Sequence, residues 1–351
     1  MREPILSLEN VAVHYARPGG LFRRAKPPVR AVDGVSFAIA EGETLGLVGE
    51  SGCGKSTIGR TVTGARQPTA GAIRYRGRGG EAVDLAALGP RERAAYFHEI
   101  RMVFQDPQSS LNPRMRVLDI IGEPLRNFGI VRGAEVRERV AGLLDLVGLR
   151  PEYLERYPHA FSGGERQRIG IARAIATDPR LLVADEAVSA LDVSIRGQIV
   201  NLMTALRERL GLTYLFVSHD LSLVRVVADE VAVMYVGRIV EKGSVEALFH
   251  RPRHPYTAAL LAAVPTGRRR GRRAAPIRGE VADPAAPPPG CRYHPRCPFA
   301  TDVCRTDTPE LRPVGVSAVA CHHAESLDLP GFLDGHAAPE PANRQNLGVA
   351  Q

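Results

Sequence analysis

The 351-residue sequence has no tryptophan, few other aromatic residues and no long apolar run. A membrane-spanning helix needs a run of about 18 apolar residues. The lack of such a run excludes a helical membrane protein. Residues 1–10 also lack the basic start and apolar core of a signal peptide. We therefore expect a cytosolic protein that reaches a membrane, if at all, through its partners.

Cysteine is scarce and unevenly distributed. Four of the five cysteines fall in the last fifth of the chain, at Cys291, Cys297, Cys304 and Cys321. In a reducing cytosol such a cluster indicates a metal site rather than disulfides. The spacing matches neither a ferredoxin run nor a pair of C-x-x-C units, so a [4Fe–4S] cluster and a structural Zn²⁺ both stay open. His294, His322 and His323 keep the zinc alternative in consideration.

Acidic residues are outnumbered, which gives a formal net charge of +8. Much of the excess lies at Arg268, Arg269, Arg270, Arg272 and Arg273. Such a cluster could meet phospholipid headgroups or nucleic acid. No aromatic residues interleave with it for base stacking, so we interpret it as a solvated linker and expect no nucleic-acid partner.

Apolar periodicity outlines the elements of an α/β protein. Residues 6–15 alternate like a half-buried strand with a bulge near Asn10, and residues 16–30 read as a loop. Further strands are predicted at 35–39, 44–48, 181–184 and 213–217, with a hairpin at 231–241. Helices are predicted from Lys55, at 136–147 and at 165–177.

A glycine-rich loop follows the predicted strand at 44–48. Residues 49–57 fit G-x-x-x-x-G-K-[ST], with Gly49, Ser51, Gly52, Cys53, Gly54, Lys55, Ser56 and Thr57 among them. The glycines let backbone N–H groups reach a phosphate, Lys55 supplies charge and the Ser56 hydroxyl can bind Mg²⁺. With a strand before it and a helix after it, this loop predicts an ATP site, in which Cys53 is only a small loop residue.

Two acids end the predicted strand at 181–184. Asp185 suits the Mg²⁺ shell of a P-loop ATPase, and Glu186 can polarise the attacking water. Strands often end in acids, so the pair alone is weak evidence for a catalytic site. It becomes strong evidence because a phosphate loop lies upstream.

A second anion site is predicted where residues 162–168 open a helix. Ser162 is a good N-cap, and Gly163 and Gly164 leave the first amides bare, which favours an anion. Read alone, the pattern favours a simple helix cap over an anion site.

Ser-Gly-Gly-Glu-Arg-Gln-Arg at 162–168 resembles the signature motif of ABC ATPases. Gln105 resembles that family's Q-loop glutamine, Ser189–Asp192 its D-loop, His219 its switch histidine and Tyr15 its adenine-stacking aromatic. The resemblance covers about residues 5–245. It implies an α/β fold, a P-loop (RecA-like) ABC ATPase core with an antiparallel β subdomain and a helical subdomain at about 106–164.

The resemblance also implies roles. Lys55, Ser56, Gln105 and Asp185 should surround MgATP, with the last three at the metal. Glu186 should be the general base, and His219 should touch the γ-phosphate. The resemblance also implies that Tyr15, Ser162, Gly163, Gly164, Glu165 and Asp192 bind nucleotide. Of these, the signature residues 162–165 should face ATP held by a second ATPase domain.

Two positions depart from the family's pattern. Ala187-Val188 replaces the usual Pro-Thr after Glu186, which loosens a turn that proline would stiffen. Glu165 replaces the commoner glutamine, a harmless change at a helix start. Since both acids remain, we predict an active site.

Three stretches resemble one branch, the oligopeptide/dipeptide importer ATPases: residues 105–114, 254–257 and 291–298. This branch implies an ATPase domain at 1–250 and a cysteine-bearing C-terminal extension at 251–328. Composition indicates a stiff Arg/Pro-rich linker at 265–290, and the lack of periodicity indicates a disordered tail at 329–351. It also implies a second, related ATPase as a heterodimer partner, two permeases and an extracytoplasmic binding protein. The subunit would sit peripherally on the cytoplasmic face of the inner membrane.

Other functions remain open on the sequence. The cargo could be another small solute such as a nickel chelate. The chain could also be a soluble ABC ATPase acting on ribosomes or DNA, although it has neither two cores nor a long coiled-coil insertion. An exporter subunit would lack the C-terminal motifs, and an inactive regulatory partner would not need Glu186 and His219. The resemblance favours iron–sulfur over zinc at the cysteines.

Overall fold

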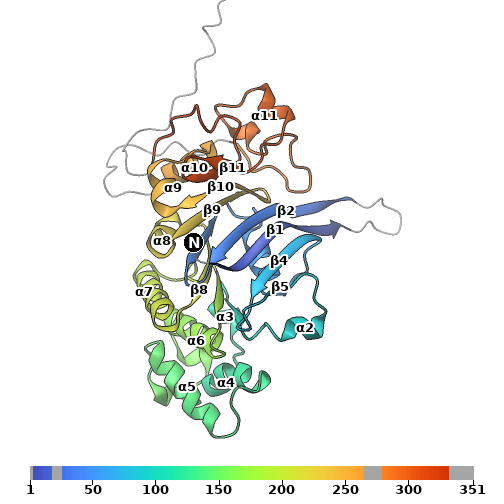
Figure 1. The fold of residues 1–351 in the computed structure, drawn as a ribbon. Coiled ribbons are helices and arrows are strands. Elements are labelled where there is room, and N and C mark those ends of the chain that lie inside the picture. The colour runs from blue at the N-terminus through green and yellow to red at the C-terminus, as the bar shows by residue number, and fades with distance from the viewer. Residues whose placement is uncertain (1–2, 18–25, 265–278, 332–351) are drawn as a thin grey trace, which may run out of the picture.

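The computed structural model describes residues 3–17, 26–264 and 279–331, and Figure 1 shows their arrangement. The arginine cluster at 268–273 and the tail from 332 lie outside the described residues. An antiparallel sheet has the order β2-β1-β4-β5, and its strands are β1 Pro4–Arg17, β2 Lys26–Ala40, β4 Ala70–Arg76 and β5 Ala82–Asp84.

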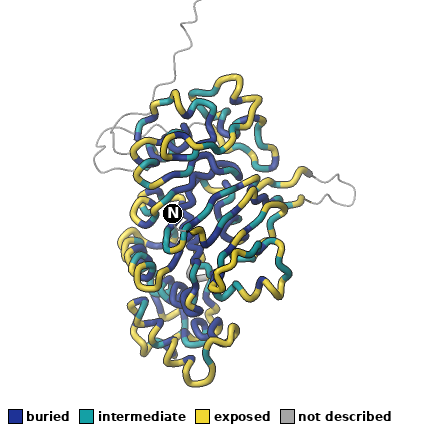
Figure 2. The backbone as a smooth tube through the Cα atoms, viewed as in Figure 1, coloured by how far each residue is buried: buried dark blue, intermediate teal, exposed yellow. Residues whose placement is uncertain are grey.

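A second sheet of eight strands has the order β11-β12-β10-β9-β3-β8-β7-β6. Its strands are β3 Thr44–Val48, β6 Ile100–Val103, β7 Leu181–Asp185, β8 Thr213–Ser218, β9 Glu230–Tyr235, β10 Arg238–Ser244, β11 Arg312–Val314 and β12 Ser317–Val319. The central strands β3, β7 and β8 are parallel and wholly buried (Figure 2). Parallel strands covered on both faces need the continuous apolar runs that the sequence carries there.

Helices cover this sheet and form a separate end of the molecule (Figure 1). Around the sheet lie α1 Lys55–Val62, α6 Gly163–Ile175, α7 Val193–Leu210, α8 Leu221–Val227, α9 Val245–His250 and α10 Pro255–Ala263, whereas α2 Pro90–Ala94 follows β5 of the antiparallel sheet. The helical end is built from α3 Pro107–Ser110, α4 Val117–Asn127 and α5 Glu135–Leu146, and α11 Asp302–Thr306 lies in the C-terminal region. The α/β fold with antiparallel and helical parts is thus as predicted.

Details of the first strands differ from expectation. The bulge is confirmed, since Asn10 has φ 48° and the β1–β2 register shifts between Leu8 and Val11. The loop predicted at 16–30 is too long, because β1 continues to Arg17 and β2 starts at Lys26. Pairing between the two strands extends their ends beyond what alternation alone indicates.

The C-terminal region completes the main sheet. β12 pairs with β10 through Glu241↔Val319 and Lys242↔Ala318. The Glu241 carboxylate is buried beneath this pairing, where it accepts the N–H groups of Arg253 at 2.7 Å and His254 at 2.9 Å. The start of α10 is therefore tied to the same strand that receives the C-terminal hairpin.

His254 makes the stability of this junction dependent on pH. Its imidazole is buried and its Nδ1 accepts the N–H of Tyr256, and burial lowers its pKa to about 3. The unfolded chain takes up a proton near pH 6.5 while the folded chain does not, so the stabilisation present above pH 6.5 is lost as pH falls. Glu241 has the opposite effect on stability. Because burial raises its pKa to about 7, its contribution to stability increases as pH falls from about 7 to 4.5.

We expect His254→Asn to remove the loss of stability in acid that His254 causes and to leave the opposite contribution of Glu241, since asparagine can also cap α10 and does not titrate. As pH falls from 6.5 to 5, the free energy of unfolding of the wild type should decline relative to that of His254→Asn. The difference should be up to about 1.4 kcal/mol per pH unit. Urea unfolding at several pH values measures this, with His159→Asn at an exposed position as the control. Parallel curves for wild type and His254→Asn would contradict the expectation.

Candidate nucleotide site

The topology brings the predicted site residues to one sheet edge. Gln105 follows β6, Asp185 ends β7 and His219 follows β8, and these three strands are parallel neighbours. The phosphate loop follows β3, which pairs with β8 on its other side. Carboxyl ends of neighbouring parallel strands meet at the same edge, where α/β proteins bind their ligands.

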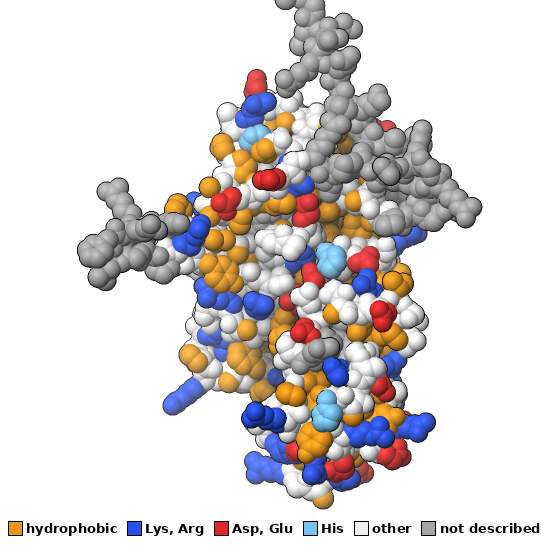
Figure 3. Space-filling view, turned by 180° about the vertical axis from the view of Figure 1, so that it is seen from behind, with side chains coloured by type: hydrophobic (Ala, Val, Ile, Leu, Met, Phe, Trp, Pro, Cys, Tyr) orange, Lys and Arg blue, Asp and Glu red, His pale blue; other side chains and the backbone are white. Residues whose placement is uncertain are grey.

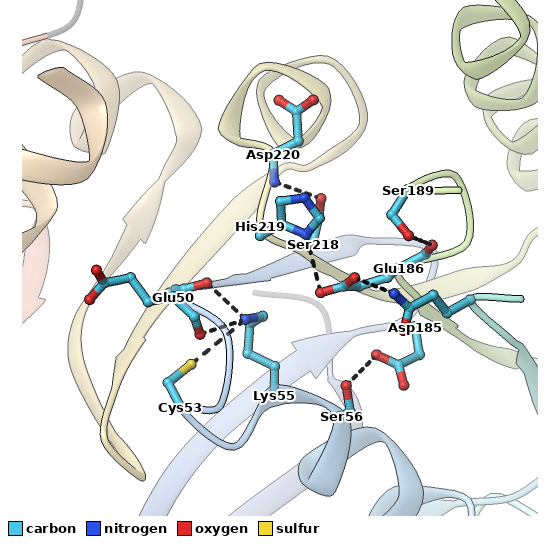
Figure 4. A network of polar contacts seen from close by, with 12 residues as sticks. Glu50, Cys53, Lys55, Ser56, Asp185, Glu186, Ser189, Ser218, His219 and Asp220 are labelled. Atoms are coloured by element: carbon cyan, nitrogen blue, oxygen red, sulfur yellow. Dashed lines mark hydrogen bonds and ion pairs between the residues drawn. The ribbon is translucent and has the colours of Figure 1, made fainter. Parts of the chain in front are cut away.

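The loop between β3 and α1 runs close to neighbouring backbone. A Cβ on Gly54, whose φ is 109°, would lie 2.0 Å from the Ala31 carbonyl oxygen, so only glycine fits there. Lys55 is buried, and its Nζ donates to the carbonyl oxygens of Gly49 at 2.8 Å and Glu50 at 3.0 Å (Figure 4). Its ammonium thus lies within the curve of the loop, where a phosphate would meet it.

The loop's other residues differ in exposure. Ser51 and Gly52 are exposed, Thr57 lies half-buried in α1, and the thiol of Cys53 is buried. Burial raises the pKa of Cys53, so this thiol stays protonated. This agrees with its interpretation as a small packing residue.

Two oxygen donors meet beside the loop. The Ser56 hydroxyl donates to Asp185 Oδ1 at 2.8 Å (Figure 4). Asp185 is buried, which raises its pKa, while the bond from Ser56 opposes that rise. A hydroxyl and a carboxylate at this separation are the hard oxygen ligands that Mg²⁺ prefers.

Glu186 is the centre of a polar network. Its Oε2 accepts from Gln105 Nε2 at 2.9 Å. Its Oε1 lies 3.2 Å from His219 Nδ1 (Figure 4). Its φ of 47° is unusual for a residue other than glycine. Such strain concentrates at functional positions. The structure thus brings together Gln105, Glu186 and His219, the three residues predicted to be catalytic.

The turn after Glu186 is held without proline. Ala187 and Val188 are buried. Ser189 donates to the Glu186 carbonyl oxygen twice, through its N–H at 3.0 Å and its hydroxyl at 2.9 Å. These bonds supply the order that the missing proline would give, and the sequence interpretation overlooked Ser189 in this role.

The signature segment opens α6 as predicted, two residues earlier than the periodicity indicated. Ser162 and Glu165 form a capping box, with the Ser162 hydroxyl accepting the Glu165 N–H at 3.3 Å and the Glu165 carboxylate accepting the Ser162 N–H at 2.9 Å. Gly163 is exposed, and a Cβ on Gly164 would lie 2.7 Å from Ile195 Cγ2. Gly164 is therefore needed for the close packing of α6 against α7.

Two further predicted residues lie at the margins of this network. Tyr15 is on β1, and the guanidinium of Arg66 lies 4.4 Å above its ring. Asp192 is the exposed N-cap residue of α7, and its carbonyl oxygen accepts the N–H of Arg196 at 2.9 Å. Their contact with a nucleotide stays a prediction.

The four C-terminal cysteines are free thiols that line one small cavity. Within residues 3–17, 26–264 and 279–331, however, no three His, Cys, Asp or Glu side chains are grouped so as to hold a metal ion. Burial raises the pKa of Cys297 to about 12 and that of Cys321 to about 11 in the metal-free chain. The predicted [4Fe–4S] or Zn²⁺ site is therefore not confirmed.

A phosphate loop, a buried acid beside it, a second acid held by Gln and His, and a capped glycine-rich helix start define a P-loop ATPase of the ABC type. Residues 32–189 match the ABC transporter family, and residues 240–304 match the oligopeptide/dipeptide transporter C-terminal region. The chain belongs to the ATP-binding proteins of the ABC transporter family, which hydrolyse ATP to drive transport.

Relatives match nearly the whole chain. The oligopeptide transport ATP-binding protein AppF of Bacillus subtilis is 49% identical over 92% of this chain and 98% of its own length. The dipeptide transport ATP-binding protein DppF of Escherichia coli is 44% identical over 94% of this chain and 97% of its own. Among solved structures, the ATP-binding cassette MJ0796, dimeric with ADP and Pi, is similar with a TM-score of 0.59 and 27% identity, covering 68% of this chain and 98% of its own.

No helix in the described part of the chain is both long and apolar enough to span a membrane.

Proposed function

We propose that this chain is the ATP-hydrolysing subunit of an importer for dipeptides or oligopeptides, bound peripherally at the cytoplasmic face of the inner membrane. The supporting observation is that its similarity to peptide-transport ATP-binding proteins extends beyond the ATPase core into the C-terminal region at 240–304. A purely catalytic likeness would stop at the core.

In this proposal residues 49–57 and 185 hold the triphosphate and its metal. The loop amides and Lys55 bind the β- and γ-phosphates. Ser56 and Asp185, with Gln105, are the Mg²⁺ ligands, and their oxygen donors fit that ion. Mg²⁺, when bound with ATP, would neutralise charge that develops on the phosphates. Tyr15 stacks on adenine.

Glu186 is proposed as the general base. Its carboxylate takes the proton of the attacking water, and Gln105 and His219, at 2.9 and 3.2 Å, fix its orientation. His219 is also proposed to donate to a γ-phosphate oxygen once it turns from Glu186. In this proposal the residues needed for hydrolysis follow the ends of β6, β7 and β8, and the pairing of these strands sets the distances between them.

A second ATPase domain completes the site. Ser162 and Gly163 are exposed at a helix start that continues through the half-buried Gly164 and Glu165, and such a start suits ATP held by a partner. Asp192 is proposed to contact the same nucleotide. The similar MJ0796 cassette is described as dimeric. We propose a heterodimer with a related ATPase, carried by two permeases, with an extracytoplasmic binding protein supplying the substrate.

An iron–sulfur cluster, with Zn²⁺ as the alternative, enters the proposal through the four cysteines at 291–321, which line one cavity. Their side chains in the described residues are not grouped as a ready-made metal site. Anaerobically purified full-length protein should contain about four iron atoms per chain. Cys304→Ser should remove them, and Cys53→Ser should not. Zinc without iron would select the alternative, and protein free of both metals would contradict the proposal.

The proposal is tested by recovering a tagged full-length chain from membranes in mild detergent and identifying its companions by mass spectrometry. We expect two permeases and a second ATPase, and loss of dipeptide uptake when the gene is deleted. Deletion that abolishes uptake of a nickel chelate instead would change the cargo and leave the importer in place.

Recovery of ribosomal or DNA-repair proteins without a permease would overturn the transport role. The surface gives that alternative no support on the face seen in Figure 3, where basic and acidic side chains are interspersed. Proteins that bind nucleic acids gather their basic residues on one face or stripe.

A further inference from the structure

Two C-terminal motifs that ATP hydrolysis leaves unexplained converge on one residue of the phosphate loop. Arg296 belongs to the segment at 291–298, and Tyr256 to the segment at 254–257. Arg296 Nη1 lies 2.6 Å from Glu50 Oε2, and its Nη2 lies 3.0 Å from Oε1. The Glu50 N–H donates to Tyr256 Oη at 2.9 Å.

Arg296 is held in a rigid setting. Its side chain is only 4% exposed, against 25% for that of Glu50. The guanidinium lies 5.8 Å from the ring centre of Tyr235 and 5.9 Å from that of Tyr293. Those rings and the ring of Tyr256 pack with centres 4.7 to 5.3 Å apart. A two-pronged, buried ion pair with aromatic support fixes direction as well as distance.

Glu50 links Arg296 and Tyr256 to Lys55. Its carboxylate is held by Arg296, its N–H by Tyr256, and its carbonyl oxygen accepts from Lys55 Nζ at 3.0 Å. All three polar groups of one loop residue are thus fixed, two of them by the C-terminal region. The position of the Lys55 ammonium depends on the main chain that these two contacts hold.

We propose that Arg296, together with Tyr256, is a positioning residue for ATP binding: the C-terminal region braces the phosphate loop in the shape that receives the triphosphate. This inference rests on the assignment of residues 49–57 to the phosphates of ATP. Arg296 does not touch the reacting atoms. Its loss should therefore weaken nucleotide binding and leave the hydrolysis step nearly intact.

The test compares the affinity of full-length variants for MgATP by titration with a fluorescent ATP analogue. Arg296→Ala should raise the Kd for MgATP about tenfold. The Kd of Arg296→Lys should lie between those of the wild type and Arg296→Ala, because an ammonium cannot form the two-pronged pair of a guanidinium. Arg312→Ala is the control, since Arg312 makes a two-pronged pair with Glu325 in the same region, and its Kd should equal that of the wild type. Glu50→Ala should match Arg296→Ala, and the double variant should be no weaker than either.

Steady-state turnover of the assembled complex provides a second measurement. KM for ATP should rise with Arg296→Ala, and kcat should stay within about twofold. Equal weakening by Arg296→Ala and Arg312→Ala, additive losses in the double variant, or wild-type affinity in Arg296→Ala would each overturn the brace. If Arg296→Ala does not fold, Arg296→Lys and Glu50→Gln carry the same comparison. A wild-type chain that binds no MgATP would instead refute the proposed nucleotide site itself.

Discussion

A Glu186→Gln variant is expected to bind MgATP but to hydrolyse it about 10²–10⁴-fold more slowly, the usual contribution of a general base. Glutamine keeps the size of the side chain and an oxygen for Gln105, but it cannot accept the proton of water. With ATP bound and hydrolysis blocked, the paired domains should remain closed. Phosphate release by a reconstituted complex measures this when the corresponding site of the partner ATPase has been disabled.

Glu246→Gln provides the matched control, because the same isosteric change is made at an exposed position in the first turn of α9. Its turnover should equal that of the wild type. Normal turnover by Glu186→Gln would remove Glu186 from the role of base. A variant that loses ATP binding together with turnover would show instead that Glu186 organises the site.

The sequence predicted the core of this site because its motifs carry local physics. A glycine-rich loop between an apolar strand and a helix can be recognised without the fold. The meeting of Gln105, Glu186 and His219 is different, since these residues are far apart in sequence. Only the parallel order β8-β7-β6 brings them together, and the sequence suggested it only through family resemblance.

The C-terminal hairpin was not predicted. β11 and β12 have three residues each, too few to show alternation, and their partner β10 lies about 70 residues upstream. A longer separation, 246 residues, concealed the link between Arg296 and Glu50. The sequence presents these two only as an unspecified position of the loop motif and an arginine before a cysteine. Long-range pairs of this kind follow from the assembled sheet and not from any local pattern.

The positive φ of Glu186 was likewise invisible in the sequence, which indicated only a turn weakened by the loss of proline. Ser189 shows how the chain resolves this, by holding the Glu186 carbonyl oxygen through two donors. The order of the turn is therefore a property of hydrogen bonds that form after folding. This supports an active site despite the departure from the family's pattern.

Ser162→Ala should slow hydrolysis of the ATP held by the partner domain by about 10–100-fold, the effect of losing a hydrogen bond to a charged group. The isolated chain should still bind MgATP at its own loop with unchanged affinity, because Ser162 serves the other site. Phosphate release is measured in a complex whose turnover is confined to the partner-held nucleotide.

Ser244→Ala separates this role from simple helix capping. Both serines are N-caps whose hydroxyl accepts an N–H of the first turn, at 3.3 Å from Glu165 and 3.1 Å from Ala247. Each substitution should therefore lower stability by about 1 kcal/mol, but Ser244 opens α9, which bears none of the signature residues. Equal slowing by both variants would mean that helix stability explains the effect. Slowing by Ser162→Ala alone would support contact between the start of α6 and the nucleotide. Beyond the cap bond that both changes remove, Ser162→Ala removes only the bond that its hydroxyl donates to Glu165 Oε2 at 2.8 Å.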